Sequence, residues 1–330
     1  MRRLSKSKIL VTGAGGFIGS HLCELCQTEG ADVRAFVHYN SRNDWGMLED
    51  LDKKALKNIE IVTGDLRDSG AVRKAVRGCH RVFHLGALIG IPYSYLNPED
   101  VIQTNVLGTL HILQASLDSG VDRLVQTSTS EVYGTAKYVP MDEKHPLNPR
   151  SPYAASKVAG DKLAESFYLT YSLPVVILRP FNTYGPRQSA RAVIPTIITQ
   201  ALTQDVVYLG NLDASRDLTY ISDTVNGYMS AGQLTGIEGE TVNLGTGVEV
   251  SVGELAKSII SLIGKPVDVQ IDEARLRPKK SEVERLLSDN RLAAQRLGWK
   301  PSITLGDGLK LTIDWIRSHL EIYQLGEYQL

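Results

Sequence analysis

The chain has 330 residues, a length that suggests about two domains. Its 42% hydrophobic and 22% charged content is ordinary for a globular protein, and 36 basic against 37 acidic side chains give no electrostatic case for binding nucleic acid. Apolar runs such as residues 173–178 are far shorter than the roughly 18 residues of a membrane span. Glycines interrupt the N-terminal apolar stretch and exclude a signal peptide. We therefore expect a cytoplasmic protein without a membrane span.

From residue 8 to about residue 178, short β-branched apolar runs alternate with helical stretches. This pattern is typical of βαβ units around a parallel sheet. The runs lack in/out alternation, as expected for strands that helices cover on both faces. We expect strands at 8–12, 32–38, 59–64, 81–85, 124–127 and 174–178. Residues 1–178 therefore predict an α/β fold, a Rossmann-type doubly wound parallel sheet.

Beyond residue 179 the pattern becomes irregular and is punctuated by Pro180, Pro186 and Pro195. Helices are expected at 252–263 and 289–297. Residues 223–231 and 240–244 have the patterns of a helix and a strand, so we expect the chain to return to the first sheet at about 218–245. The remaining residues, 179–217 and 246–330, predict a smaller C-terminal domain that binds the substrate.

A glycine-rich turn follows the first expected strand. Gly13, Gly16 and Gly19 stand between this strand and a helix whose apolar face includes Ile18 and Leu22. Glycine permits a tight turn and lets backbone N–H groups approach a pyrophosphate at the positive end of a helix. Because no lysine follows the turn, a Walker loop is excluded. The turn predicts a dinucleotide site, the alternative being a turn that serves packing alone.

The tip of the second strand bears on the choice of cofactor. An acidic residue at this place grips the adenosine ribose of NAD, but residues 38–42 contain none. Asn40, Ser41 and Arg42 can instead accept the 2′-phosphate of NADP, so NAD and NADP both stay open, with a solvated loop arginine as the alternative. Asp65, after the third strand, is placed for a contact with adenine or for a simple turn.

The main chemical signal is a tyrosine and a lysine four residues apart. Tyr153 and Lys157 share one face of an expected helix, where the ammonium can lower the pKa of the phenol. A phenolate can take a hydroxyl proton while hydride leaves the same carbon for a nicotinamide. The spacing alone is common in helices, but the glycine turn about 140 residues upstream makes it a strong signal.

Further short motifs are distributed along nearly the whole chain: Gly64-Asp65, His84-Leu85, Thr104-Asn105-x-x-Gly108-Thr109, Arg179-Pro180-Phe181-Asn182, Arg216-Asp217 and Leu297-Gly298-Trp299. With the glycine turn and the Tyr/Lys pair, they resemble the extended short-chain dehydrogenases/reductases, and among them the nucleotide-sugar epimerases and dehydratases. The resemblance implies an N-terminal domain that binds NAD(P), a C-terminal domain that binds a nucleoside-diphosphate sugar, and a homodimer.

The resemblance also implies site residues. Those expected to bind the cofactor are Gly13, Gly16, Phe17, Ile18, Gly19, Asn40, Ser41, Arg42, Asp65, Leu66, Leu85, Ala87, Asn105, Thr127, Tyr153, Lys157 and Pro180. Those expected to bind the substrate are Ser94, Asn182, Arg191, Arg216, Asn243, Arg277 and Glu282. No metal site is expected, because Cys23 and Cys26 have no second cysteine pair nearby.

The motif Thr129-Ser130-Glu131 separates reactions within this family. Simple 4-epimerases carry Ser or Ala where this chain has Glu131, whereas Thr-Ser-Glu resembles GDP-mannose 4,6-dehydratases. Residues 182–195 and 277–289 resemble the N-acetylglucosamine-nucleotide 4,6-dehydratases of legionaminic acid pathways. The resemblance implies a 4,6-dehydratase acting on GDP- or UDP-N-acetylglucosamine. The alternatives are a UDP-glucuronate decarboxylase, where Thr-Ser-Glu also occurs, a 4-epimerase, and a catalytically silent NAD(P)-binding subunit.

In the expected dehydratase reaction, Tyr153 takes the proton of the C4 hydroxyl and Thr129 hydrogen-bonds the C4 oxygen. Lys157 fixes Tyr153 and the nicotinamide ribose. Glu131 takes the C5 proton and, through Ser130 or water, helps the C6 hydroxyl leave.

Overall fold

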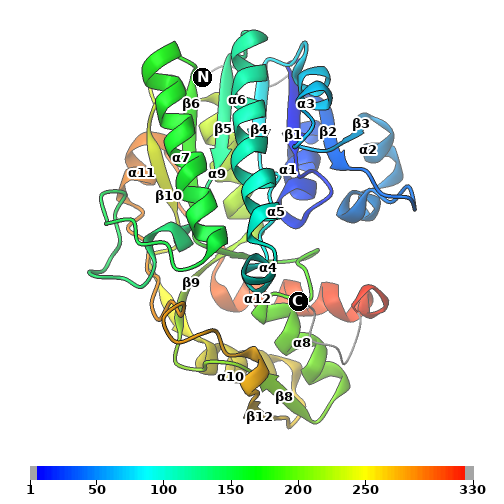
Figure 1. Ribbon diagram of the computed structural model, residues 1–330. Helices are drawn as coiled ribbons and strands as arrows, with labels where there is room; N and C mark the ends of the chain where they lie inside the picture. Colours follow the sequence, from blue (N-terminus) through cyan, green and yellow to red (C-terminus); the bar gives the residue numbers. More distant parts are fainter. Residues whose placement is uncertain (1–5, 324–330) are drawn as a thin grey trace.

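A seven-stranded parallel sheet forms the centre of the molecule (Figure 1). The computed structural model describes residues 6–323. The strands are β1 (Lys8–Thr12), β2 (Asp32–His38), β3 (Ile59–Gly64), β4 (Arg81–His84), β5 (Arg123–Thr127), β6 (Val175–Pro180) and β10 (Thr241–Leu244). They lie in the order β10-β6-β5-β4-β1-β2-β3, and every neighbouring pair is parallel. The predicted Rossmann-type sheet is confirmed.

Helices cover both faces of this sheet, which explains why its strands show no in/out alternation. One face carries α3 (Ser69–Val76), α6 (Gly108–Asp118) and α7 (Pro152–Tyr171), and the other carries α1 (Phe17–Thr28) and α9 (Ile221–Gln233) (Figure 1). Ile9 and Val11 of β1 lie in one hydrophobic cluster, while Leu10 between them lies in the other. Within residues 6–323, no helix combines the length and the apolar character that crossing a bilayer requires.

The first three strands have the bounds that the sequence predicts, and β6 extends two residues beyond its expected end, to Pro180. The chain also returns to the large sheet as predicted, because α9 leads into β10, which pairs with β6. Shorter helical segments connect the elements: η1 (Gly46–Asp50), α2 (Lys53–Lys57), α4 (Ile91–Leu96), α5 (Pro98–Ile102), the π-helical η2 (Gln103–Leu107), η3 (Ser130–Tyr133), η4 (Glu273–Arg275), α11 (Arg291–Leu297) and η5 (Leu320–Ile322).

The remaining elements lie beyond the carboxyl ends of the large sheet's strands and include two small sheets (Figure 1). One has the order β11 (Glu249–Ser251), β9 (Ser215–Tyr220), β7 (Asn182–Tyr184), and the other pairs β12 (Asp268–Ile271) with β8 (Val206–Leu209). Three helices accompany them, α8 (Val193–Thr203), α10 (Val252–Ile263) and α12 (Leu305–Ser318). The sequence predicted the α10 helix but neither small sheet.

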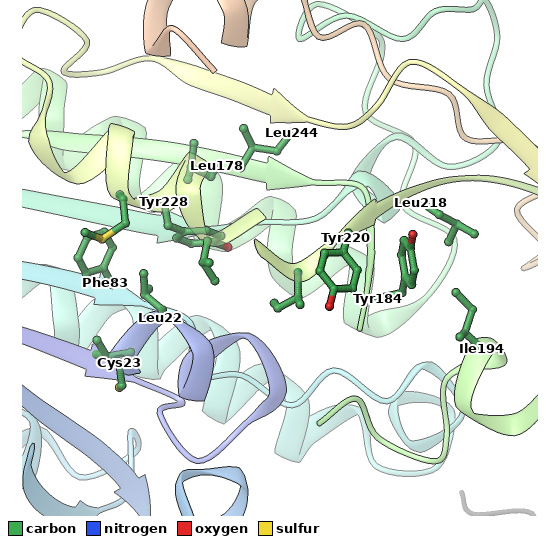
Figure 2. Packing of buried hydrophobic residues seen from close by; sticks show 14 of the residues in the cluster. Leu22, Cys23, Phe83, Leu178, Tyr184, Ile194, Leu218, Tyr220, Tyr228 and Leu244 are labelled. Carbon is green, nitrogen blue, oxygen red and sulfur yellow. The ribbon is translucent and has the colours of Figure 1, made fainter. Parts of the chain in front are cut away.

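A single hydrophobic cluster joins the large sheet to these outer elements. Figure 2 shows Leu22 of α1, Phe83 of β4 and Tyr228 of α9 at one end of the cluster, and Tyr184 and Ile194 at the other. All five side chains are buried. The outer elements are therefore packed on the sheet through a common core.

Two polar contacts fasten the loop after β7 to the first helix. The His21 ring Nε2 lies 3.0 Å from the carbonyl oxygen of Pro186, and Arg187 pairs with Glu24 at 2.9 Å. Burial, followed by the charge of Arg187, lowers the pKa of His21 to about 4, so this ring is neutral near pH 7. The contacts join α1 directly to the outer elements.

Asp217 of β9 organises the segments beside it. The carboxylate is fully buried and accepts hydrogen bonds from the backbone N–H groups of Thr246, Gly247 and Ser288, and from the Thr246 hydroxyl. Each donor would lose its partner if the carboxylate were removed, at a cost of about 1–3 kcal/mol per buried group. Asp217 therefore fixes the positions of β9, the turn after β10 and the segment around Ser288 relative to one another.

Replacing Asp217 by Asn tests this role. The amide keeps the volume but has one oxygen instead of two, and its NH2 group faces donors, so we expect a loss of about 3 kcal/mol in the free energy of unfolding. Urea unfolding followed by circular dichroism measures the change. Asp213→Asn, at an exposed residue just before β9, is the control and should shift the free energy by less than about 0.5 kcal/mol. Equal stability of the two variants would contradict this role.

Candidate active site

The glycine turn brings three backbone segments into close contact at the carboxyl edge of the sheet. Gly13 has a φ of +68°, and a Cβ on it would lie 2.8 Å from the backbone nitrogen of Gly86. A Cβ on Gly19 would lie 2.1 Å from the carbonyl oxygen of Gly13. Gly16 is the N-cap of α1, and no side chain caps the helix, whose first turn contains Phe17 and Ile18. The uncapped helix end suits a bound anion such as a pyrophosphate.

The segment after β4 forms the neighbouring wall of the site. Thr12 Oγ1 accepts hydrogen bonds from the backbone N–H groups of Leu85 and Gly86 at 3.1 and 3.0 Å. It also contacts the ring of His84, whose other nitrogen reaches Thr109 at 3.1 Å. Burial, and then the charge of Lys157, lowers the pKa of His84 to about 3, so the ring stays neutral and serves as a structural link.

Asn105, predicted to bind the cofactor, fixes the backbone of the segment after β4 through hydrogen bonds to Leu88. Its side-chain oxygen accepts from the Leu88 N–H at 2.7 Å, and its NH2 group donates to the Leu88 carbonyl and to Ser156, both at 2.9 Å. Since its amide is fully engaged in these bonds, Asn105 orients the segment that contains Leu85 and Ala87.

The tip of β2 contains an acidic residue that the sequence analysis did not weigh. Asn40 accepts hydrogen bonds from the N–H groups of Arg42 and Asp44, and the Asp44 carboxylate lies 3.4 Å from the Arg42 guanidinium. Ser41 is an exposed residue of the same turn. A 2′-phosphate at Arg42 would therefore meet the negative charge of Asp44.

Asp65 follows β3 and is paired with a neighbouring arginine. Arg67 reaches its carboxylate at 2.6 Å, and this contact, with the Arg67 backbone N–H, lowers the pKa of Asp65 to about 2. Leu66 beside it is buried and lies close to Gly86 and Gly108. The side chain of Asp65 thus closes a turn in the free protein, and its contact with adenine stays a prediction.

Tyr153 and Lys157 lie one turn apart on α7, as predicted, and both are buried. Tyr153 is hydrogen-bonded to Thr129, which caps η3 and accepts from the Glu131 N–H at 3.2 Å. Thr127 at the end of β5 accepts a hydrogen bond from Tyr228, at 3.0 Å. The residues of η3 and the first turns of α7 therefore meet at the carboxyl edge of β5.

Burial dominates the acid–base properties of this pair. It raises the pKa of Tyr153 well above its ordinary value despite the hydrogen bond to Thr129, and it lowers the pKa of Lys157 to about 8, partly offset by Asp161. The expectation that the Lys157 ammonium lowers the pKa of the phenol is thus not met in the free protein. The reason is the cost of placing a phenolate in a buried site.

A buried ion pair that the sequence analysis missed lies next to Lys157. Asp161, one turn further along α7, pairs with Arg179 of β6 at 3.0 Å and accepts from Ser128 at 2.8 Å. Arg179 donates to the Tyr133 hydroxyl at 2.9 Å and lies over its ring. The spacing of four residues from Lys157 to Asp161 could have predicted that the carboxylate lies beside the ammonium on the same face of the helix.

Asn243, predicted to contact the substrate, lies inside this network. It is fully buried, accepts from the Tyr133 hydroxyl at 2.7 Å and donates to the Met141 carbonyl at 3.1 Å. Ser94 is also fully buried, and its hydroxyl donates to the Ile91 carbonyl in its own helix. Both side chains bond to protein groups in the free protein, and their contacts with the substrate stay predictions.

Other predicted substrate residues lie nearer the edge of the sheet. The side-chain oxygen of Asn182, just after Pro180, is buried without a hydrogen-bond partner, which suits a group that meets a ligand. Arg191 is exposed in the loop before α8 and would be 3.8 Å from a Cβ on Gly90.

The catalytic candidate Glu131 forms an ion pair with the segment that follows η4. Its carboxylate lies 3.6 Å from the Arg277 guanidinium, and Arg216 of β9 lies 3.9 Å from Glu282. Ser130, next to Glu131, is buried. Arg216, Arg277 and Glu282, which are far apart in sequence from Glu131, are therefore brought to the same place as the carboxylate. The described residues hold no cluster of His, Cys, Asp or Glu that could bind a metal ion.

Known proteins resemble this chain over most of its length. The profile of the family described as GDP-mannose 4,6 dehydratase matches residues 10–312. The UDP-glucose 4-epimerase of Mycolicibacterium smegmatis is 33% identical over 94% of this chain and 99% of its own, and the dTDP-D-glucose 4,6-dehydratase of Mus musculus is 31% identical over 98% and 92%.

A solved structure agrees with the fold as well. The dTDP-glucose 4,6-dehydratase DesIV from Streptomyces venezuelae, whose structure contains NAD, superposes with a TM-score of 0.84 at 30% identity over 96% of this chain and 99% of its own. The sequence resemblance is confirmed by the family profile, the relatives and the shared fold. The chain belongs to the NAD-dependent epimerase/dehydratase family of extended short-chain dehydrogenases/reductases.

Proposed function

We propose that this protein is a nucleotide-sugar 4,6-dehydratase, which converts a nucleoside-diphosphate hexose to its 4-keto-6-deoxy form. The observation that carries the proposal is Glu131, a carboxylate buried beside Tyr153, where its charge acts on the phenol. A 4-epimerase transfers hydride at C4 only and needs no second base, whereas elimination of water requires removal of the C5 proton. GDP- and UDP-N-acetylglucosamine are the substrates that the sequence resemblance favours.

The roles of the protein side chains follow from their positions. Tyr153 takes the C4 hydroxyl proton, Thr129 holds the same oxygen, and Lys157 supplies a positive charge one helical turn away. The C4 ketone then acidifies C5, and Glu131 removes that proton as the C6 hydroxyl leaves as water. Ser130 is the neighbouring hydroxyl that can pass a proton to this leaving group. NAD(P), when bound, supplies the reversible hydride acceptor.

We assign the pyrophosphate of this cofactor to the uncapped start of α1, and the nucleotide sugar to residues 179–217 and 246–330. Asn182, with its unpartnered buried oxygen, and the arginines at 191, 216 and 277 support the second assignment. The homodimer that the resemblance implies would use the outer surfaces of residues 98–118 and 152–171, where Ile102, Leu107 and Leu169 are exposed.

One specific observation favours 4-epimerisation as the second candidate. A relative that is 33% identical over 94% of this chain is named as a UDP-glucose 4-epimerase. The same Tyr153 and Lys157 would serve that reaction, and Glu131 would then act only through its charge. UDP-glucuronate decarboxylation and a silent NAD(P)-binding subunit are further outcomes that the isotope experiment below separates.

NAD is the cofactor we propose, because Asp44 places a negative charge beside Arg42, where the 2′-phosphate of NADP would lie. Titration calorimetry should give tighter binding of NAD+ than of NADP+. The variant Asp44→Asn keeps an oxygen for the Gly46 N–H but removes the charge, so its NADP+ affinity should rise about two- to fivefold with little change for NAD+. A wild-type preference for NADP+ would contradict the assignment.

Tyr153→Phe tests the proton acceptor. The substitution removes the hydroxyl but keeps the packing of the ring, so turnover should fall at least about a hundredfold while the affinity for the nucleotide sugar stays nearly unchanged. Steady-state kinetics and calorimetry measure the two quantities separately. If the variant retained more than about a tenth of the rate, Tyr153 would not be the base.

Isotope labelling separates the candidate reactions. Substrate deuterated at C4 should give a product with deuterium in the C6 methyl group, and reaction in heavy water should place solvent deuterium at C5. NMR and mass spectrometry locate the label after incubation with UDP-, GDP- and dTDP-hexoses and with UDP-glucuronate, whose C6 carboxylate is the source of any carbon dioxide. Return of the label to C4 indicates an epimerase, release of carbon dioxide a decarboxylase, and no conversion of any sugar a silent subunit.

The matched variant for this experiment is Glu131→Gln. The amide cannot take the C5 proton, yet Tyr153 remains in place for the first oxidation. The variant should accumulate reduced cofactor or oxidised sugar, seen by absorbance at the nicotinamide band, and release no 4-keto-6-deoxy product. Full product formation by this variant would remove Glu131 from the elimination step.

A further inference from the structure

Four charged side chains from three distant segments meet beside the candidate catalytic centre. Glu131 comes from η3, Arg216 from β9, and Arg277 and Glu282 from the segment after η4. Glu131 lies 3.6 Å from Arg277, and Arg216 lies 3.9 Å from Glu282. The exposed fractions of the side chains are 12% for Glu131, 27% for Arg277, 11% for Arg216 and 17% for Glu282. Two positive and two negative charges therefore balance in a largely buried space.

The balance depends on both carboxylates. Burial lowers the pKa of Arg216, and the like charge of Arg277 lowers it further. The negative charges of Glu131 and Glu282 act in the opposite direction and favour the charged guanidinium. Two guanidinium groups kept out of water without a counter-ion would be strongly unfavourable. In the free protein, Glu131 thus offsets the positive charge of Arg277, although its proposed work is to accept a proton.

We propose that Glu131 is the counter-ion of the diphosphate site while that site is free, and that a bound nucleoside diphosphate takes Arg277 from it and releases the carboxylate as the base. This inference rests on the proposed function for the role of Glu131 in the reaction. The contact of 3.6 Å is longer than a direct charged hydrogen bond. A diphosphate offers more oxygens and more negative charge, and a guanidinium binds it in a bidentate manner.

The exchange of partners makes the Glu131 carboxylate available for the reaction. Once Arg277 turns to the diphosphate, the Glu131 carboxylate no longer has this guanidinium as its partner and is free to accept a proton from the substrate. Proton removal at C5 is then coupled to the correct seating of the diphosphate.

The segment that carries Arg277 is anchored close by. The Ser281 hydroxyl contacts the Tyr95 hydroxyl at 2.5 Å and the Arg150 carbonyl at 2.6 Å, and Val283 is fully buried. With Ser281 and Val283 fixed, Arg277 can change its partner by a side-chain movement while the segment stays in place.

A double-mutant cycle on nucleotide binding tests the exchange. Holoenzyme loaded with NAD+ is titrated by calorimetry with dTDP, UDP and GDP, and the nucleotide that binds most tightly is used throughout. Glu131→Gln removes the competing charge and should lower the Kd about threefold or more. Arg277→Gln should raise the Kd about tenfold or more. In the Arg277→Gln background, the effect of Glu131→Gln should vanish, because the competition no longer exists.

The matched control is Glu284→Gln, which removes the same charge from an exposed residue of the same segment and should leave the Kd unchanged. Glu131→Ala serves as a second variant, and thermal denaturation confirms that each protein is folded. An unchanged or higher Kd for the Glu131 variants, an equal gain with and without Arg277, or no binding of any of the three nucleotides would overturn the proposal.

The cycle uses nucleotides without a sugar, so its result is independent of the reaction. If the isotope label returns to C4 but the cycle shows coupling, the dehydratase assignment fails and the counter-ion exchange stands. If the label moves to C6 without coupling, the reverse holds.

Discussion

The site depends on how closely backbone segments approach one another at the carboxyl edge of β1 and β4. The strand order reverses between these two strands, and ligands of doubly wound sheets bind at such a point. Gly13, Gly19 and Gly86 meet there at distances that leave no room for a Cβ. The absence of three side chains thus lets the glycine turn, the start of α1 and the segment after β4 approach closely. Thr12 fixes the segment after β4 by accepting two backbone hydrogen bonds.

A second constraint is the burial of charge around α7. Lys157 is buried beside Asp161, whose carboxylate is in turn bound by Arg179 and Ser128. Burial raises the pKa of Tyr153, so the free protein keeps the phenol protonated near pH 7. A bound cofactor with an oxidised, positively charged nicotinamide would add a second positive charge to that of Lys157, and both charges would favour the phenolate.

The sequence predicted the large sheet well because most of its strands contain a short, largely buried apolar run, as burial between two layers of helices requires. It did not predict β7 and β11, since three residues are too short for a period to appear. The Tyr153/Lys157 pair was found because both residues lie in one helical turn. The contact of Glu131 with Arg277 was not, because a pairing between distant segments depends on the path of the chain through the outer elements. The bond between Asn243 and Tyr133 was not predicted for a related reason: a polar residue near a strand end can face a neighbouring side chain as well as a ligand.

The contacts of α1 with the loop after β7 also bear on how long a cofactor would stay. His21 and Glu24 bind the middle of this helix to Pro186 and Arg187, while the proposed pyrophosphate site lies at the start of the same helix. Release of a dinucleotide from a helix fixed in this way would have to occur without help from a swing of the helix itself. Such an arrangement suits a reaction in which the nicotinamide returns to its starting oxidation state in every turnover, since the enzyme then gains nothing from exchanging it with the pool in solution.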